Sequence, residues 1–445
     1  MKNLLKIFLP LTLLVFVQVS CNTTEPKIEP ELLLKLEDVS CSEAWLQLST
    51  NNIQLPATIN LLKNNTVAQT FSLSTQDSLL YIDSLLPNQN YSFQVSSILS
   101  ATGGQVSSNK LAATTLDTTS HNFTWQTFEF GQHSSSTLYD VAIINENDIW
   151  AVGEIYMNDS LGNPDPICYN AVHWSGQSWE LKRIMFYTFC PQGTGEGSYP
   201  AQSVFAIDDQ NILISSGSQI AYISNGVQIK KECVPVSVNK IWGTTMNDIF
   251  IVGYSGGIAH FNGSRWTMIE TGTTISLNDI FGLAGEKNIW ITGYNISNGN
   301  GVFLKYDGIT VEKIYEVAPG LPGWEEARKD QISGAMLGVW SAGIHSNWLA
   351  TSLGFYKFPQ NTYGEGTLDY EIVFPVGFLM DIRGDELNNI FAVGHYKTIF
   401  HYNGIRWALL MLDFNSGGIL HSVATKNHTV IAVGSNGKAI IIKCN

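Results

Sequence analysis

A short apolar block, preceded by a polar residue and ended by a small one, recurs along most of the chain. Three copies read Asp-Ile-Trp-Ala-Val-Gly at 148–153, Asp-Ile-Phe-Ile-Val-Gly at 248–253 and Asn-Ile-Trp-Ile-Thr-Gly at 288–293. Four further copies end at residues 216, 352, 394 and 434. Each block has the length of one strand, and β-branched and aromatic residues, which favour strands, dominate it. The pattern predicts a series of strand-rich units of similar size.

The spacing of the copies indicates how these units assemble. Four of the six intervals between block ends are 37 to 42 residues, and the other two are 63 and 59 residues. Units of roughly 40–45 residues with four strands each are typical of β-propeller blades, and the two long intervals are interpreted as blades with insertions. A single such sheet cannot bury both faces, so neighbouring sheets pack together. The sequence predicts an all-β protein with a propeller over residues 122–445, seven blades being expected and six or eight the alternatives.

The last copy of the block is followed by only one more strand, at 439–444. An apolar segment with a matching tryptophan, residues 122–130, precedes the first copy. We expect this segment to complete the last sheet and close the ring, which would remove an exposed strand edge.

The first residues have the pattern of an export signal. Lys2 and Lys6 begin an apolar stretch that ends at Val19, and Ser20 and Cys21 follow. This ending resembles the lipobox of bacterial lipoproteins, and the resemblance implies that Cys21 becomes the lipidated first residue. We expect a signal peptide at 1–21, a polar tether at 22–30 and a lipid-anchored position in the bacterial cell envelope, at the outer membrane or cell surface.

Residues 31–118 have the features of one small β-sandwich. Trp45 lies in an apolar strand pattern, and the segment 86–95 reads Leu-Pro-Asn-Gln-Asn-Tyr-Ser-Phe-Gln-Val. This segment resembles the fibronectin type III module. The resemblance implies a corner at which the Tyr91 hydroxyl bonds to backbone. We expect this domain to act as a spacer between the anchor and the propeller.

Charge and cysteine content restrict the partners. The net charge is −14, from 38 acidic and 24 basic residues, and this disfavours binding to nucleic acid. Cys168 and Cys190 lie in the two insertions of the first blade, and we expect a disulfide between them because export permits oxidation. The state of the remaining cysteines stays open. The sequence has no Cys-x-x-Cys pair, so it predicts no metal site and no cofactor. We expect a monomer.

Long loops on a rigid scaffold carry function more often than the repeats themselves. Three insertions, at 154–168, 184–201 and 315–333, are predicted to lie at the same end of the ring. They combine aromatic side chains with carboxylates, which suits recognition of a glycan or a peptide; the alternative is that the aromatics pack the loops onto the ring. The candidate binding residues are Tyr156, Tyr187, Tyr199, Glu196, Trp324, Glu325 and Glu326.

A second candidate is the mouth of the central channel at that end. Polar residues are predicted to open several inner strands, namely Asp140, Lys240, Asp279 and Asp381. Carboxylates around a narrow mouth could hold a cation or a polar group, or they could cap the backbone.

The turn-and-tryptophan pattern around Trp179, Trp266 and Trp407 resembles the WD40, YVTN and sialidase-type (BNR-like) propellers. Sialidases need an arginine triad, but two of the five arginines here, Arg265 and Arg406, belong to repeat turns. No complete catalytic motif is found. The sequence therefore favours a surface-anchored binding or scaffold lipoprotein that recognises a protein or glycan of the cell envelope. The alternatives are a glycan-active enzyme (glycoside hydrolase, lyase or glucosyltransferase-like) and an envelope assembly factor.

Overall fold

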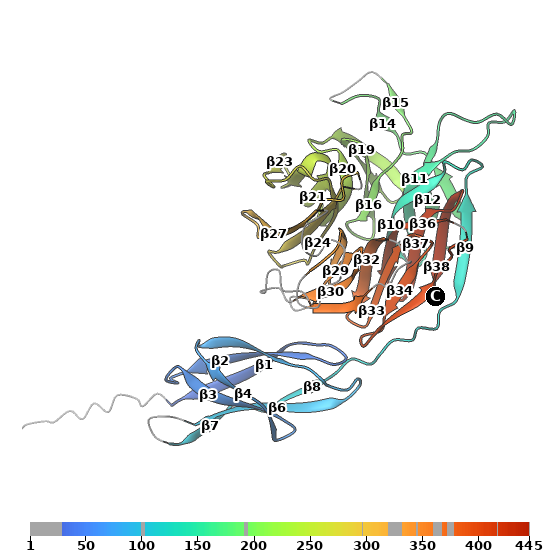
Figure 1. Cartoon of the computed structure of the whole chain (residues 1–445). Helices are drawn as coiled ribbons and strands as arrows, with labels where there is room; N and C mark the ends of the chain where they lie inside the picture. Colours follow the sequence, from blue (N-terminus) through green and yellow to red (C-terminus); the bar gives the residue numbers. More distant parts are fainter. Residues whose placement is uncertain are drawn as a thin grey trace, which may run out of the picture. The chain divides into compact units, whose positions relative to one another are not determined.

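The computed structural model describes most of the chain (Figure 1). The described residues are 29–98, 103–190, 195–295, 297–318, 332–343, 346–358, 367–371, 378–415 and 417–444. In these residues every regular element is a strand except the short 3-10 turn η1 (Tyr254–Gly256). No helix in this part of the chain is long and apolar enough to cross a membrane.

The chain divides into two compact units. The first takes in the described residues up to Lys35, together with Gln47–Leu79 and Ser92–Leu111. The second takes in Leu36–Leu46, Leu80–Tyr91 and the chain from Ala112 onwards.

The N-terminal strands form two sheets that contribute to both units. One sheet has the order β1 (Glu31–Val39), β2 (Ala44–Asn51) and β5 (Asp77–Ile82). The other consists of β4 (Thr66–Leu73), β3 (Ala57–Lys63), β6 (Asn90–Ile98) and β7 (Gln105–Ser107), with β8 (Leu111–Thr114) also paired to β6. Alternate apolar side chains are buried, as in Leu46 and Leu48. The Leu86 amide donates to the Tyr91 hydroxyl at 2.9 Å, the bond expected of a tyrosine corner.

Seven four-stranded sheets, numbered here as blades one to seven, occupy the described residues from Trp125 to Cys444. Blades one to three are β10 (Thr137–Asn145), β11 (Asp148–Ile155), β12 (Tyr169–Trp174) and β13 (Trp179–Lys182); β16 (Ser203–Ala206), β17 (Asn211–Ser216), β18 (Gln219–Ser224) and β19 (Val227–Cys233); and β20 (Val238–Thr245), β21 (Asp248–Gly253), β22 (Ile258–Phe261) and β23 (Trp266–Ile269). Blades four and five are β24 (Leu277–Gly282), β25 (Ile289–Tyr294), β26 (Gly301–Tyr306) and β27 (Val311–Val317); and β28 (Met336–Ser341), β29 (Asn347–Thr351), β30 (Gly354–Phe358) and β31 (Thr367–Glu371). Blades six and seven are β32 (Leu379–Glu386), β33 (Asn389–Gly394), β34 (Ile399–Tyr402) and β35 (Trp407–Met411); and β36 (Ile419–Lys426), β37 (Thr429–Ser435), β38 (Ala439–Cys444) and β9 (Trp125–Phe130).

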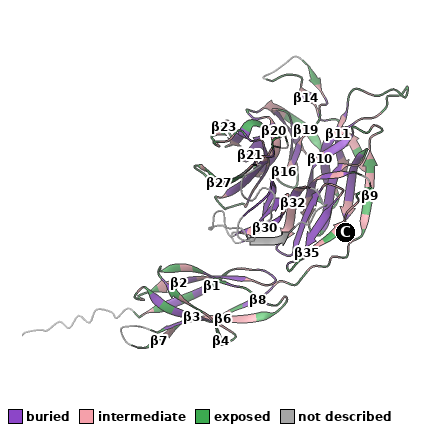
Figure 2. Cartoon of the chain, in the orientation of Figure 1, coloured by how far each residue is buried: buried purple, intermediate pink, exposed green. Residues whose placement is uncertain are grey.

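The first strands of these blades contact one another in chain order, and β36 of blade seven contacts β10 of blade one. This closed order of contacts makes the arrangement a β-propeller. Clusters of buried side chains occupy the junctions between neighbouring blades. Second strands such as β17, β21 and β33 are buried along most of their length (Figure 2). One cluster joins Trp150 of blade one to Ile214 of blade two. Each sheet thus buries its faces against its two neighbours, as the repeat requires.

The closing strand lies where the sequence predicts it. β9 pairs antiparallel with β38, with Trp125 opposite Cys444 and Phe130 opposite Ala439. The Phe128 ring lies 5.9 Å from that of Trp179 in blade one, so β9 also packs across the junction of blades seven and one. A strand from before the first blade therefore completes the last one.

The polar residue that begins the repeated block has a structural partner in three blades. The His173 imidazole bonds to Asp148 at 2.9 Å, and its ring stacks on Trp150 with centroids 4.3 Å apart. His260 bonds to Asp248 at 2.7 Å. His401 bonds to Asn389 at 3.1 Å. The block thus joins the second strand of a blade to its third through a hydrogen bond and a ring contact.

The expected disulfide between Cys168 and Cys190 is wrong. Cys190 is bonded to Cys233 instead, with Cα atoms 5.8 Å apart, while Cys168 is a buried thiol. The reason lies in the insertion between blades one and two, which forms the hairpin β14 (Phe186–Tyr187) and β15 (Glu196–Gly197). β14 contacts β18, so Cys190 lies beside the end of blade two, whereas the Cys168 thiol points to the Ser198 carbonyl, 3.6 Å away.

Candidate functional site

A β-bulge interrupts the inner strand at the same place in six of the seven blades. In β10 the pairing with β11 passes from Leu138 to Asp140 and leaves Tyr139 without a partner. The residues left out in the same way in the other blades are Asn239, Asn278, Leu337, Met380 and His421. A bulge re-aims the side chain of its extra residue, and all six of these residues line one central cavity.

The small residue that ends the repeated block makes room for this bulge. A Cβ on Gly253 would lie 1.8 Å from the Ser237 carbonyl oxygen. A Cβ on Gly434 would lie 1.9 Å from the Ile419 oxygen. The inner-strand backbone therefore passes so close to the block that only glycine fits at these positions. The repeat that builds the blades also sets the direction of the cavity-lining side chains.

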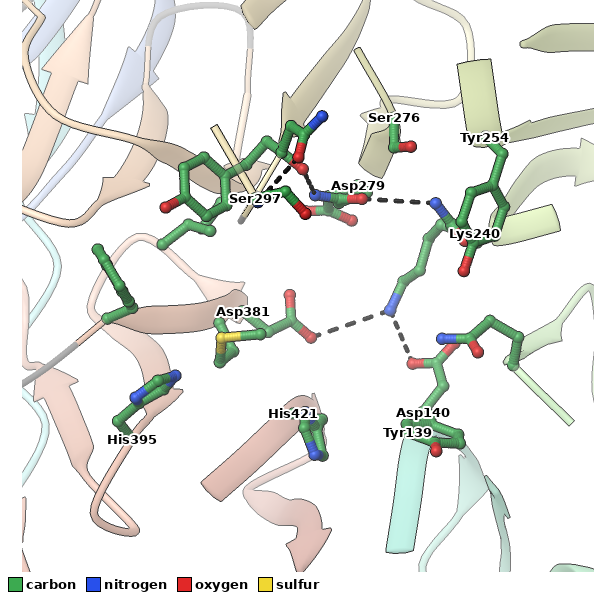
Figure 3. A pocket seen from close by; sticks show the side chains of 18 residues that line it. Tyr139, Asp140, Lys240, Tyr254, Ser276, Asp279, Ser297, Asp381, His395 and His421 are labelled. Atoms are coloured by element: carbon green, nitrogen blue, oxygen red, sulfur yellow. Dashed lines mark hydrogen bonds and ion pairs between the residues drawn. The ribbon is translucent and has the colours of Figure 1, made fainter. Parts of the chain in front are cut away.

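The residues next to the bulges form a buried ionic network at the floor of the cavity (Figure 3). Lys240 Nζ lies 2.7 Å from Asp140 Oδ1 and 3.9 Å from Asp381 Oδ2. The Arg383 guanidinium bonds to Asp279 at 2.6 and 3.0 Å and to Asp381 at 2.8 Å. The structure thus brings together the four residues proposed for the channel mouth. It adds Arg383, which no sequence pattern singles out.

The three aspartates also join neighbouring blades. Asp140 Oδ2 accepts the Val204 amide at 3.0 Å. Asp279 Oδ2 accepts the Val339 amide at 2.9 Å, and Asp381 Oδ2 accepts the Val423 amide at 3.1 Å. Each acceptor belongs to one blade and each donor to the next, so the carboxylates tie the inner strands together. Their geometry is that of backbone-capping groups.

The ion pairs offset the effect of burial on the pKa of two members of the network, Lys240 and Asp381. Burial alone would lower the pKa of Lys240, but Asp140 and Asp381 outweigh it and raise the pKa above its ordinary value. Burial likewise opposes ionisation of Asp381, yet Arg383 and Lys240 hold the pKa of that carboxyl below its usual range. In Asp279 burial has the larger effect and raises the pKa. Three carboxylates and two cations give the floor a formal charge of −1.

The cavity above this floor has a volume of about 470 Å³. That lies within the range of roughly 300–1,000 Å³ found for small-molecule sites. Tyr254, Asn295 and His395 also line the cavity. Each of them directly follows the second strand of its blade, so the cavity opens at the end of the ring where the second strands end. The remaining lining residues are Asp140, Gln202, Lys240, Ser276, Asp279, Tyr294, Ser297, Phe378 and Asp381.

Four of the loop residues proposed for binding are described, namely Tyr156, Tyr187, Tyr199 and Glu196, and none of these four lines this cavity. The Tyr156 hydroxyl donates to Glu154 at 2.7 Å, and Glu154 also accepts the hydroxyl of the cavity-lining Tyr139 at 2.5 Å. Tyr156 therefore reaches the cavity wall only through Glu154. Burial of Tyr139 and its bond to this carboxylate raise the pKa of the Tyr139 hydroxyl.

The other loop candidates gather on the hairpin β14–β15. Glu196 forms an ion pair with Lys231 at 2.6 Å, and the Lys231 ammonium lies 4.8 Å from the Tyr187 ring centroid. The Tyr199 hydroxyl donates to Thr188 at 3.0 Å. Gln219 holds the backbone of Tyr187 with two bonds of 2.8 Å. The hairpin is therefore fixed to blade two. Trp324, Glu325 and Glu326, like Cys21, lie outside the described residues.

Comparisons with known proteins identify no family. No protein-family description matches the sequence, and no curated protein matches it. Among solved structures, YCF48 bound to D1 peptide has a TM-score of 0.49 and 12% identity, covering 72% of this chain and 94% of that chain. The WD40 β-propeller domain of Doa1 has a TM-score of 0.49 and 11% identity, covering 73% and 97%. The extracellular domain of BT4673 from B. thetaiotaomicron has a TM-score of 0.49 and 11% identity, covering 72% and 39%. Similarity at this level carries no argument about function.

Proposed function

We propose that the protein is a binding or scaffold module and that its ligand, a protein or glycan of the cell envelope, occupies the central cavity. The observation that carries this proposal is the series of bulges, which turns six side chains into one open cavity above a charged floor. A rigid wall also lowers the entropy cost of binding.

The glycan-active enzyme receives less support. Glycoside hydrolysis needs one carboxyl group as proton donor and a second as base or nucleophile. Among the described residues that line the cavity, the carboxylates are Asp140, Asp279 and Asp381. Each of these is engaged by a cation and by a backbone amide of the next blade.

Blocking the cavity tests the proposed function. The full-length chain, in a detergent without a sugar headgroup, is applied to glycan and peptide arrays beside Ser276→Trp, whose new side chain fills the cavity. The matched control is Ser264→Trp, which places the same side chain in an exposed turn of blade three. We expect specific ligands to bind the wild type and the control but not Ser276→Trp. The proposal is overturned if the ligands also bind Ser276→Trp or if no ligand binds the wild type. Cleavage of glycans on the array would support the glycan-active enzyme.

We propose further that the chain is a lipid-anchored lipoprotein of the bacterial cell envelope. In this arrangement Cys21 carries the lipid, residues 31–118 form a fibronectin type III-like spacer, and the seven sheets are the complete set of blades. The ending Val19-Ser20-Cys21 after an apolar stretch supports the anchor. Metabolic labelling with an alkyne fatty acid tests it, because Cys21→Ser is expected to abolish labelling and membrane association. Retained labelling in Cys21→Ser contradicts the anchor.

A further inference from the structure

The wall of the cavity has an aromatic side. Blades six, seven and one contribute rings there, and Figure 3 shows His395, His421 and Tyr139 along one side. The Tyr139 and His421 rings lie 5.6 Å apart, and the Phe378 and His395 rings also lie 5.6 Å apart. The Phe378 ring continues to Tyr294, 5.9 Å away. These contacts form two groups of rings on the cavity wall, Tyr139 with His421 and His395 with Phe378 and Tyr294.

The facing side carries amides. Blades two, three and four contribute Gln202, Asn239, Asn278 and Asn295. Asn239 donates to the Leu277 carbonyl at 2.9 Å, and Asn278 donates to the Tyr294 carbonyl at 3.0 Å, so both amides are held in place. The Gln202 side chain makes no hydrogen bond to another described residue. Its carboxamide offers donors and an acceptor to a ligand.

The described polar side chains that line the cavity above the floor are amides, hydroxyls and imidazoles. Burial lowers the pKa of both His395 and His421, the latter to about 4, with His395 adding to the effect on His421. Both imidazoles are therefore neutral at pH 7, each with one donor and one acceptor. The described cations of the floor, Lys240 and Arg383, are already paired with carboxylates and are therefore not available to an anionic ligand. The overall charge of −14 acts in the same direction.

Tyr254 extends over the mouth with 58% of its surface exposed. The turn that carries it is fixed by Ser255 and Gly256, both with positive φ, of 55° and 71°. The Gly257 amide closes this turn on the Tyr254 carbonyl at 3.0 Å. An aromatic ring exposed on a rigid turn at the mouth of a cavity can stack on a ligand without prior rearrangement.

We propose that the cavity binds a neutral saccharide unit, with the apolar face of the sugar against the aromatic side and its hydroxyl edge against the amides. This assignment rests on the proposed binding function and specifies its ligand. Sugars combine an apolar ring face with many neutral hydroxyl groups, which is the complement of these two sides. A basic or acidic peptide has no matching unpaired charge among the described groups above the floor.

Calorimetric titration of the full-length chain tests the ligand class. The probes are neutral oligosaccharides of hexose and N-acetylhexosamine units, uronic acid-containing oligosaccharides, oligolysine and an acidic peptide. We expect saturable binding of at least one neutral oligosaccharide and none of the charged probes. Ser276→Trp is expected to abolish this binding.

Single substitutions separate the two sides of the cavity. Gln202→Ala removes a neutral hydrogen bond and is expected to weaken binding roughly three- to tenfold. Gln210→Ala, a matched change at an exposed site, is expected to have no effect. Tyr254→Ala is expected to weaken binding about tenfold, while Tyr254→Phe keeps the stacking ring and most of the affinity. Equal loss in Tyr254→Ala and Tyr254→Phe contradicts the stacking role.

The possible failures can be told apart. Binding of a peptide or an acidic saccharide that Ser276→Trp abolishes overturns the neutral sugar and leaves the cavity as the binding site. Binding of a neutral saccharide that Ser276→Trp leaves intact overturns the cavity as its site. If no neutral saccharide binds, the saccharide assignment is wrong.

Discussion

At the scale of single residues, the buried network at the cavity floor is expected to stabilise the fold through its ion pairs. Arg383 is the only described cation within bonding distance of Asp279, and it also pairs with Asp381. Sequence patterns placed Asp140, Asp279 and Asp381 at the channel because they recur at one repeat position. Arg383 lies two residues beyond that position, and its partner Asp279 belongs to blade four. Only the closed ring brings these two residues together.

Removing the guanidinium is expected to leave buried carboxylates without a cation. Arg383→Gln should lower the free energy of unfolding by about 3–5 kcal/mol, the usual cost of breaking a buried pair. Arg265→Gln makes the same change in an exposed turn and should cost less than about 1 kcal/mol. Denaturant unfolding measures both. Equal, small losses would show that the network contributes little to stability.

Histidine burial predicts a dependence of stability on pH. Burial and the neighbouring His121 lower the pKa of His401 to about 3 from the ordinary 6.5. The unfolded chain therefore takes up a proton that the folded chain excludes. The stabilisation is complete above pH 6.5 and is lost as the pH falls from 6.5 towards 3, by at most about 1.4 kcal/mol per pH unit.

Unfolding free energies between pH 7.5 and 4 test this dependence. We expect His401→Gln to give a flatter profile than the wild type, since the group that takes up the proton on unfolding is gone. His428→Asn, at an exposed turn with positive φ, should leave the slope unchanged. Parallel slopes for the wild type and His401→Gln would contradict the assignment.

At the scale of elements, the repeated block predicts the blades well and the cavity poorly. Its apolar residues locate strands such as β21 and β33, because burial between sheets requires them. The same block carries the signal for the cavity in its terminal glycine. The sequence alone does not reveal the role of this glycine, because the close approach of the inner strand to Gly253 is visible only in the structure. The sequence does not predict the Cys190–Cys233 bond, because that bond depends on the packing of the hairpin β14–β15 on blade two.

A methyl group at Gly253 tests whether the glycine that ends the block is needed for the close approach of the inner strand. Gly253 has extended backbone, so Gly253→Ala adds no dihedral strain, but its methyl group would clash with the Ser237 carbonyl. We expect a loss of about 1–3 kcal/mol in stability together with weaker ligand binding, because Asn239 would move with the inner strand. Gly226→Ala, in an exposed turn with positive φ, should destabilise but leave affinity unchanged. Unchanged affinity in Gly253→Ala contradicts the link between block and cavity.

At the scale of the whole molecule, the ring depends on one strand from before the first blade. Replacing residues 125–130 by a Gly-Ser segment of equal length removes the partner of β38 and the packing of Phe128 on Trp179. We expect a lower melting temperature and faster hydrogen exchange in all blades, because each sheet depends on its neighbours. The same replacement at the exposed residues 158–163 should affect that loop alone. Faster exchange limited to blade seven would show that closure is a local feature.

The proposed ligand lies at one mouth of the ring, in the cavity lined by the bulge residues. Hydrogen–deuterium exchange of the full-length chain, with and without the tightest-binding saccharide of the panel, tests this claim most directly. We expect slower exchange in peptides that contain Tyr254, Asn295, His395 and His421, which line the cavity. Protection confined to the hairpin β14–β15, or to the N-terminal sheets, would contradict it.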